Sequence, residues 1–231
     1  MCGRFGMAAD IEGVLDYFWF DPSSVQYKQR YNVAPTDPVL TYGAQGPRTA
    51  EYMRWGLIPS WSKPGGRKLP LAINARAEGI ATQPMFKRPF QHRRCLVLSD
   101  GFYEWARPDA GAGGGAGAVT PYRIGLASWG VFGFAGLWDE WTGPEGTVRS
   151  CTIITTTPNE LVAPIHDRMP VIVPPEAHEE WLDADNHDTE ALGRLLVPYP
   201  SGAMAAYEVG KAVGDVKNDT PVVMEPVRRL L

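Results

Sequence analysis

The sequence has few cysteines and no long run of apolar residues. Its three cysteines, Cys2, Cys95 and Cys151, are widely spaced, with no Cys-x-x-Cys pair and no Cys/His ligand spacing. This pattern argues against a disulfide framework and a structural zinc site, and it favours a reducing cytoplasm. No stretch approaches the ~18 apolar residues of a membrane span, and no export signal is recognisable. We therefore expect no membrane contact, no metal and no other cofactor.

The chain also lacks a net positive charge. A formal net charge of -4 over 231 residues gives no global reason to expect a polyanionic partner, so any nucleic-acid surface has to be a local basic groove. Hydrophobic residues make up 44% of the sequence, which is enough for a sizeable core. We expect one monomeric domain over residues 1–231.

Strand signals dominate the chain. Segments rich in β-branched and aromatic residues lie between Gly and Pro punctuation, at residues 39–42, 51–57, 94–99, 122–126, 131–138 and 151–156, with a short one near 204–209. Helical spacing is found within residues 9–18, 175–182 and 189–196. Since parallel βαβ alternation is absent, the sequence predicts an α+β fold with twisted, barrel-like antiparallel β-sheets and a few short helices.

A Gly/Ala-rich run occupies residues 111–118, between two strand signals. We interpret it as a flexible hairpin insertion at about 109–119 rather than a linker between domains. It contains no phosphate-loop lysine and precedes no helix signal, which argues against a nucleotide cradle.

The most distinctive residue is Cys2, which directly follows Met1. Removal of that methionine would leave an α-amine and a thiol on one residue. The amine can condense with an aldehyde, and the thiolate can attack a carbonyl or the resulting imine. The amine titrates near pH ~8 and a free thiol near ~8.5, so small shifts make both nucleophilic at cytoplasmic pH. The alternative is an ordinary packing cysteine.

Two further segments combine polar side chains with apolar surroundings. Within residues 71–78, Asn74 can hold an amine or an oxyanion and Arg76 can grip a phosphate. The alternative is a capping Asn beside a surface Arg-Glu pair. Within residues 100–105, Glu104 lies among three aromatic residues, which would raise its pKa and suit it to proton transfer. The alternative is a solvent-facing Glu on an alternating strand.

A third segment contains His166, one of four histidines in the chain. Flanked by Asp167 and Arg168, His166 is typical of an acid/base or anion-positioning residue, although a histidine in a polar turn is often just a surface residue. Aromatic and basic residues also interleave within residues 52–68 and 86–94. This interleaving suits single-stranded nucleic acid, with core packing of most tryptophans as the alternative.

Six short motifs follow one another along the chain. They are Met1-Cys2-Gly3-Arg4-Phe5, Tyr31-Asn32-Val33-Ala34-Pro35, Ile73-Asn74-Ala75-Arg76-Ala77-Glu78, Gly101-Phe102-Tyr103-Glu104-Trp105, His166-Asp167-Arg168-Met169-Pro170 and Val213-Gly214-Asp215-Val216-Lys217-Asn218. In order and separation they resemble the SRAP (SOS response-associated peptidase) family over nearly the whole chain.

The resemblance implies a lyase-like enzyme that recognises abasic sites in single-stranded DNA and crosslinks to them through Cys2, shielding the lesion during the DNA damage response. The amine of Cys2 would form an imine with the open-chain sugar, and the thiolate would close a thiazolidine. Asn74 would position the amine or a sugar oxygen, Glu104 would move protons, and His166 would donate one. The family's peptidase label refers to a proposed autoproteolytic removal of the residues before Cys2.

The resemblance also implies DNA contacts that are largely independent of sequence. The matching positions are Arg4, Asn32, Pro35, Trp61, Arg76, Thr155 and Arg168. Two positions depart from the family pattern: Ser62 stands where some members have a second tryptophan, and Gln83-Pro84 stand where an arginine can occur. We expect a cytoplasmic protein that associates with the nucleoid through DNA.

Other functions stay open at this point. An opening Met-Cys-Gly also begins class II glutamine amidotransferases, in which the N-terminal cysteine attacks a side-chain amide. The chain has no recognisable glutamine-pocket segment, and the remaining motifs would go unexplained. A thiol protease acting on other proteins is a further alternative. So is a non-covalent reader of modified DNA, whose salt-sensitive binding would survive loss of Cys2.

Overall fold

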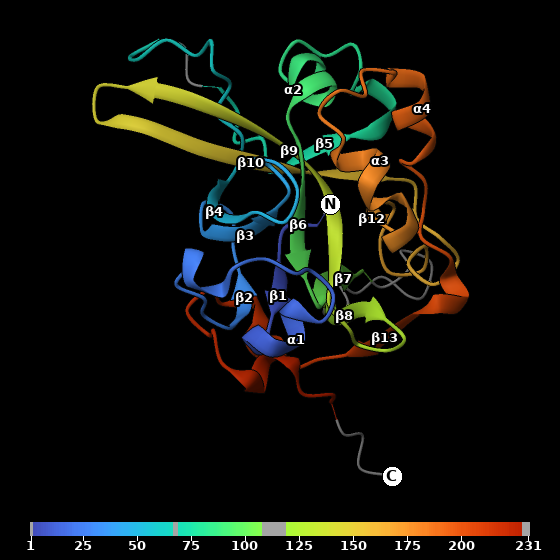
Figure 1. Ribbon diagram of the computed structural model, residues 1–231. Coiled ribbons are helices and arrows are strands. Elements are labelled where there is room, and N and C mark those ends of the chain that lie inside the picture. Colours follow the sequence, from blue (N-terminus) through green and yellow to red (C-terminus); the bar gives the residue numbers. More distant parts are fainter. Residues whose placement is uncertain (1, 67–68, 108–118, 228–231) are drawn as a thin grey trace.

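The computed structural model describes residues 2–66, 69–107 and 119–227, which form two β-sheets surrounded by short helices (Figure 1). The glycine-rich insertion predicted at about 109–119 lies outside the described residues, apart from its last position. The predicted α+β class with barrel-like sheets is confirmed.

Five strands of the larger sheet close into a barrel. In order around it they are β10 (Gly146–Thr156), β4 (Ala50–Trp55), β3 (Pro38–Tyr42), β6 (Arg94–Ser99) and β9 (Phe132–Gly143), which pairs again with β10. Every pairing in this ring is antiparallel except the parallel β10–β4 pair. Three short strands extend it: β5 (Asn74–Arg76) and β11 (Met169–Pro170) on β10, and β12 (Ile172–Val173) on β9.

The smaller sheet is antiparallel throughout. In spatial order its strands are β13 (Met204–Glu208), β8 (Thr120–Leu126), β7 (Gly101–Ala106), β1 (Phe5–Met7) and β2 (Arg30–Val33). Strand β1 is paired on both edges, because Phe5 lies opposite Phe102 on one side and Val33 on the other. The N–H of Tyr103 donates to the carbonyl of Arg4 at 2.9 Å, which extends the ladder towards Cys2.

The helices are short and lie outside the sheets (Figure 1). The α-helices are α1 (Ile11–Leu15), α2 (Lys87–His92), α3 (His178–Leu182) and α4 (Thr189–Arg194). Single 3₁₀ turns occupy Pro22–Ser24, Ala77–Gly79, Pro175–Ala177, Ser201–Ala203, Lys211–Gly214 and Pro221–Met224. Asp10 and Asp188 cap α1 and α4 by accepting hydrogen bonds from backbone N–H groups of the first turn. Within the described ranges, no helix has the length and apolar character needed to cross a membrane.

The two faces of the barrel strands pack into two different hydrophobic cores, and for this reason β6 is buried at every position. Leu96 and Leu98 belong to the core that packs under α2 and α3, which also contains Trp181. Val97, which points the other way, belongs to the core shared with the smaller sheet. Cys2 lies in that second core.

Several elements differ from the sequence prediction. Strands β1, β2, β5, β7, β11 and β12 lie outside the segments with strand signals, and β10 begins at Gly146 rather than at residue 151. Strand β9 continues past Trp138 to Gly143, and with β10 it forms a long hairpin that projects from the body of the molecule (yellow in Figure 1). Helix α2 was not predicted because Pro89 interrupts the segment. Pro89 is the third residue of the helix, where its missing N–H would have no partner within the helix.

A buried ion pair fixes the chain after β1. Asp100 accepts hydrogen bonds from the N–H groups of Ala8 and Ala9 at 2.7 and 2.9 Å and pairs with Arg123 at 2.9 Å. We predict that Asp100→Ala lowers the free energy of unfolding by about 3–5 kcal/mol, because the Arg123 charge stays buried without its partner. Urea denaturation measures the loss.

The control is Arg194→Ala, which removes an exposed pair with Glu190 on one face of α4. This variant should lose less than about 0.5 kcal/mol. Equal losses in the two variants would contradict the assignment of Asp100 as a buried anchor.

Candidate functional site

Four side chains predicted from separate motifs converge at one place. Cys2 precedes β1, Asn74 begins β5, Glu104 lies in β7, and His166 lies in the segment between β10 and β11. The amide Nδ2 of Asn74 donates to the carbonyl of Cys2 at 2.8 Å. The Nε2 of His166 is 3.8 Å from Oε2 of Glu104. The two sheets therefore contribute to one polar cluster.

The Cys2 thiol is fully buried in this cluster. Burial raises the pKa of the Cys2 thiol, and the negative charge of nearby Glu104 raises it further. The Sγ atom lies 3.8 Å from the carbonyl of Arg4, which can accept a weak hydrogen bond from it. At neutral pH the thiol is therefore protonated, and its reaction as a nucleophile requires a base.

Glu104 and His166 are the titratable side chains of this cluster that could exchange a proton with the thiol. Burial raises the pKa of Glu104 to about 7, so the carboxyl group can donate or accept a proton near neutrality. Burial lowers the pKa of His166 and favours its neutral form. Nδ1 of His166 lies 3.0 Å from the N of Arg168 and 2.9 Å from Oδ1 of Asp167, while Nε2 faces Glu104.

Several buried polar atoms around the cluster make no hydrogen bond within the part of the chain that the structure describes. They are Oδ1 of Asn74, Oγ1 of Thr155, and the Nε atoms of Arg4 and Arg168. Leaving a buried polar atom unpaired costs about 1–3 kcal/mol, so such atoms together indicate a site built for a ligand rather than for stability.

Arg4 and Asn32 lie beside the cluster but are largely occupied by the protein itself. Arg4 Nη1 donates to Oδ1 of Asn32 and to the carbonyl of Val213, both at 2.9 Å. The buried amide of Asn32 donates to the carbonyls of Val213, Asp215 and Asn218. The motif at residues 213–218 is therefore held next to Arg4 and β2.

Arg168 is held on the other side of His166. Its guanidinium forms a two-pronged pair with the carboxylate of Glu78, at 2.5 and 3.0 Å, and donates to the carbonyl of Thr155 at 2.6 Å. This pairing lowers the pKa of Glu78. Thr155 of β10 lies opposite Arg76 of β5, whose side chain is exposed. Pro35, also predicted as a DNA contact, is half-buried in the turn after β2.

A cleft of about 440 Å³ adjoins the cluster through Asn74. Its lining also includes Trp61, Leu71, Pro84 and Phe86. Trp61 is 55% exposed, so its ring is accessible from solvent at the edge of this cleft. The structure thus brings Trp61 and Asn74 to one surface and places Pro84, where the chain departs from the family pattern, in the same cleft.

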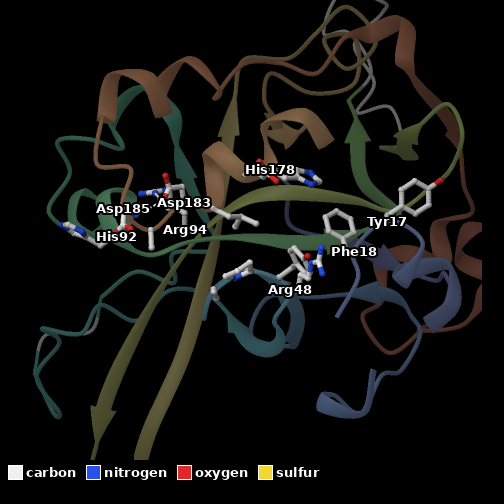
Figure 2. Close-up of a pocket in the computed structure, with 16 residues that line it drawn as sticks. Tyr17, Phe18, Arg48, His92, Arg94, His178, Asp183 and Asp185 are labelled. Atoms are coloured by element: carbon white, nitrogen blue, oxygen red, sulfur yellow. Dashed lines mark hydrogen bonds between the residues drawn. The ribbon is translucent and has the colours of Figure 1, made fainter. Parts of the chain in front are cut away.

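A larger cavity of about 580 Å³ contains none of the predicted site residues (Figure 2). It lies between the end of α1, the turn after β3, and α3, and His178 stacks on Phe18 in its wall with ring centroids 5.2 Å apart. Arg94 at its other end is fully occupied by backbone carbonyls, including those of Trp181 and Phe90. Cavity size therefore does not identify the site here. In the described ranges no cluster of metal-binding side chains is found.

Sequence analysis did not single out two residues that also touch this region. Asp139 and Trp141 of β9 form hydrogen bonds with the turn that carries Trp61. No motif marks them, because the contact depends on how the β9–β10 hairpin passes the turn.

The raised pKa of Glu104 makes stability depend on pH. The contribution of the Glu104 carboxyl to the free energy of unfolding is fully present below 4.5, the ordinary pKa of glutamate. It is lost as pH rises through the raised pKa of about 7. His166, whose pKa is lowered, acts in the opposite direction. We predict that wild type loses about 3 kcal/mol relative to Glu104→Gln between pH 4.5 and pH 8, measured by urea denaturation. A difference between the two proteins that stays constant across this range would contradict the assignment.

Comparisons with known proteins agree on one family. The family model described as SOS response associated peptidase (SRAP) matches residues 1–216. The Abasic site processing protein YoqW of Bacillus subtilis is 42% identical, over 97% of this chain and 99% of that relative. The Abasic site processing protein HMCES of Xenopus tropicalis is 31% identical, over 90% of this chain and 69% of that relative.

The same fold is found among solved structures. A crystal structure of a protein from Bacteroides thetaiotaomicron has a TM-score of 0.83 and 26% identity, covering 98% of this chain and all of the other. The family match and the identities show that the chain belongs to the SOS response associated peptidase (SRAP) family.

Proposed function

We propose that the protein recognises abasic sites in single-stranded DNA and captures them covalently through Cys2 once Met1 is removed. Its relatives are named abasic site processing proteins. The observation that carries the proposal is the enclosure of Cys2, whose carbonyl is bound by Asn74 and whose thiol lies within electrostatic range of Glu104. An amine and a thiol on one residue, next to a group that titrates near neutrality, suit capture of an aldehyde.

The first step forms an imine. An abasic sugar exists partly as a closed hemiacetal, and protonated Glu104 can donate a proton to the ring oxygen as the ring opens. The amine of Cys2 then adds to the C1′ aldehyde, and loss of one water gives the imine. Glu104 supplies and recovers the protons, because its pKa of about 7 leaves both forms populated.

The second step closes a ring. The Cys2 sulfur adds to the imine carbon, a C–S bond forms, and the C=N electron pair moves to nitrogen, which gains the proton that the thiol loses. The product is a thiazolidine, with one water released overall and no oxidant or reductant consumed. Closure is intramolecular, and such reactions reach effective molarities of ~10⁵ M or more.

The neighbouring residues orient these steps. Asn74 holds the Cys2 backbone through Nδ2, and its Oδ1 can accept a hydrogen bond from the amine or a sugar hydroxyl. Nε2 of His166 faces Glu104, and the imidazole can return a proton to the departing oxygen.

DNA binding is proposed for the surface around this cluster. Exposed Arg76 supplies a phosphate contact and Trp61 a stacking surface. Buried Thr155 lies opposite Arg76, and half-buried Pro35, in the turn after β2, supplies a further contact. Arg4 and Arg168 each have a buried Nε that makes no hydrogen bond within the described residues. Buried Asn32 acts through Arg4 rather than by touching DNA. In this proposal the chain acts as a monomer on cytoplasmic DNA.

Covalent capture predicts a defined mass. After incubation with single-stranded DNA carrying one abasic site, intact-mass analysis should show protein lacking Met1 plus DNA minus one water. Cys2→Ala should abolish this product, and Cys2→Ser should give a weaker, reversible link. Glu104→Gln should slow its formation about 100-fold or more, the usual contribution of a general acid/base. A heat-stable adduct that persists in Cys2→Ala would overturn the proposal.

The phosphate contact of Arg76 predicts a change in salt dependence. Arg76→Ala should reduce the slope of log affinity against log salt by about 0.7, the value for one phosphate contact on a single strand. Fluorescence anisotropy over a salt series measures the slope. Arg194→Ala, which changes the same charge on α4, is the matched control and should leave the slope unchanged. Equal slopes for wild type and Arg76→Ala would exclude this contact.

A further inference from the structure

Trp61 lies in a tight turn, and the residues before and after it form hydrogen bonds with strand β9. The N–H of Ser62 donates to the carbonyl of Pro59 at 2.9 Å, which closes a four-residue turn with Trp61 in its third position. Residues in turns are usually mobile at the surface, and a half-exposed tryptophan in one would sample many orientations. Here the turn has further contacts that restrict it.

Three side chains of the β9–β10 hairpin bind alternate residues of this segment. Asp139 Oδ2 accepts from the N–H of Ser60 at 2.7 Å. Trp141 Nε1 donates to the carbonyl of Ser62 at 2.7 Å. Two residues before Ser60, the N–H of Ile58 donates to Ser150 Oγ at 2.8 Å.

The three side chains share one face of the hairpin. Asp139 and Trp141 are two residues apart in β9, and Ser150 of β10 lies directly opposite Asp139. Asp139 is 3% exposed, and its other oxygen accepts from the N–H of Glu140 and pairs with Arg93. A buried carboxylate fixed by three donors is a rigid support, and it holds a turn whose central side chain is 55% exposed.

We infer that Asp139 and Trp141 are positioning residues, which hold the turn at residues 59–62 so that the ring of Trp61 is preorganised beside Asn74 as a stacking surface for a DNA base. The inference rests on the proposed function for its ligand. Fixing the turn before binding reduces the conformational entropy lost when a base stacks, so the effect appears in DNA affinity rather than in the chemical step.

The test is a double-mutant cycle between Trp141→Phe and Trp61→Ala. The probe is a single-stranded oligonucleotide with a tetrahydrofuran abasic analogue, which has no aldehyde, so Kd is measured without crosslinking. Trp141→Phe keeps an aromatic ring and removes the hydrogen bond to Ser62, and it should raise Kd about fivefold. In the Trp61→Ala background the same change should leave Kd unaltered, because its effect passes through Trp61.

Thr147→Ala is the matched control. It removes an exposed hydrogen bond with Thr142 near the end of the same hairpin, away from the turn, and should leave Kd unchanged. Asp139→Asn is a second variant for the cycle if Trp141→Phe does not fold. With natural abasic DNA at saturation, the rate constant of adduct formation should be unchanged in Trp141→Phe, which a general loss of structure would not produce.

Two results would overturn the inference: no rise in Kd for Trp141→Phe, or an equal rise with and without Trp61. Failure of the proposed function has a different signature. If wild type binds the analogue but forms no adduct with natural abasic DNA, covalent capture is wrong, while a non-additive cycle still supports the positioning role.

Discussion

The site depends on the pairing of β1 along both of its edges. Phe5 and Gly6 pair with β7 on one side, and Phe5 pairs with β2 on the other. The ring of Phe5 packs edge-on against Trp55 of the barrel, with centroids 5.0 Å apart. A strand fixed in this way cannot fray without breaking the contact between the two sheets. Cys2, directly before it, is therefore a core residue with a defined position.

Burial around Cys2 also sets the protonation of its neighbours. Desolvation disfavours every charged form, so it raises the pKa of Glu104 to about 7 and lowers the pKa of His166. These shifts reverse the ordinary order of proton affinity, because the pKa of Glu104 is raised above the ordinary imidazole value of 6.5 and the pKa of His166 is lowered below it. Near neutral pH, Glu104 is therefore the more basic group of the two, whereas in an exposed pair it would be the imidazole. The same burial that keeps the Cys2 thiol protonated thus gives Glu104 a pKa suited to the role of base that we propose for it.

The sequence predicted the fold class and many of the longer strands, because β-branched and aromatic runs mark strands wherever one face is buried. It did not predict β1, β5 and β7, which carry or adjoin site residues, or the full length of β9. Residues 139–142 alternate poorly, since one face of the projecting hairpin is buried against the turn of Trp61 rather than in a core. The four candidate catalytic residues came together through motif resemblance, as no periodicity links Cys2, Asn74, Glu104 and His166. Their convergence depends on the parallel pairing of β5 with β10, which local sequence does not encode.

Motif residues in this chain fall into two kinds that sequence cannot separate. Asn32 has its amide oxygen and nitrogen engaged by Arg4 and by carbonyls of residues 213–218. Asn74 uses Nδ2 in the same way, but its buried Oδ1 makes no hydrogen bond to the residues that the structure describes. Folding alone would favour pairing both, because an unpaired buried acceptor is costly. The unpaired atom is therefore the one where a ligand is expected, and a fully paired motif residue such as Asn32 is expected to build the wall around it.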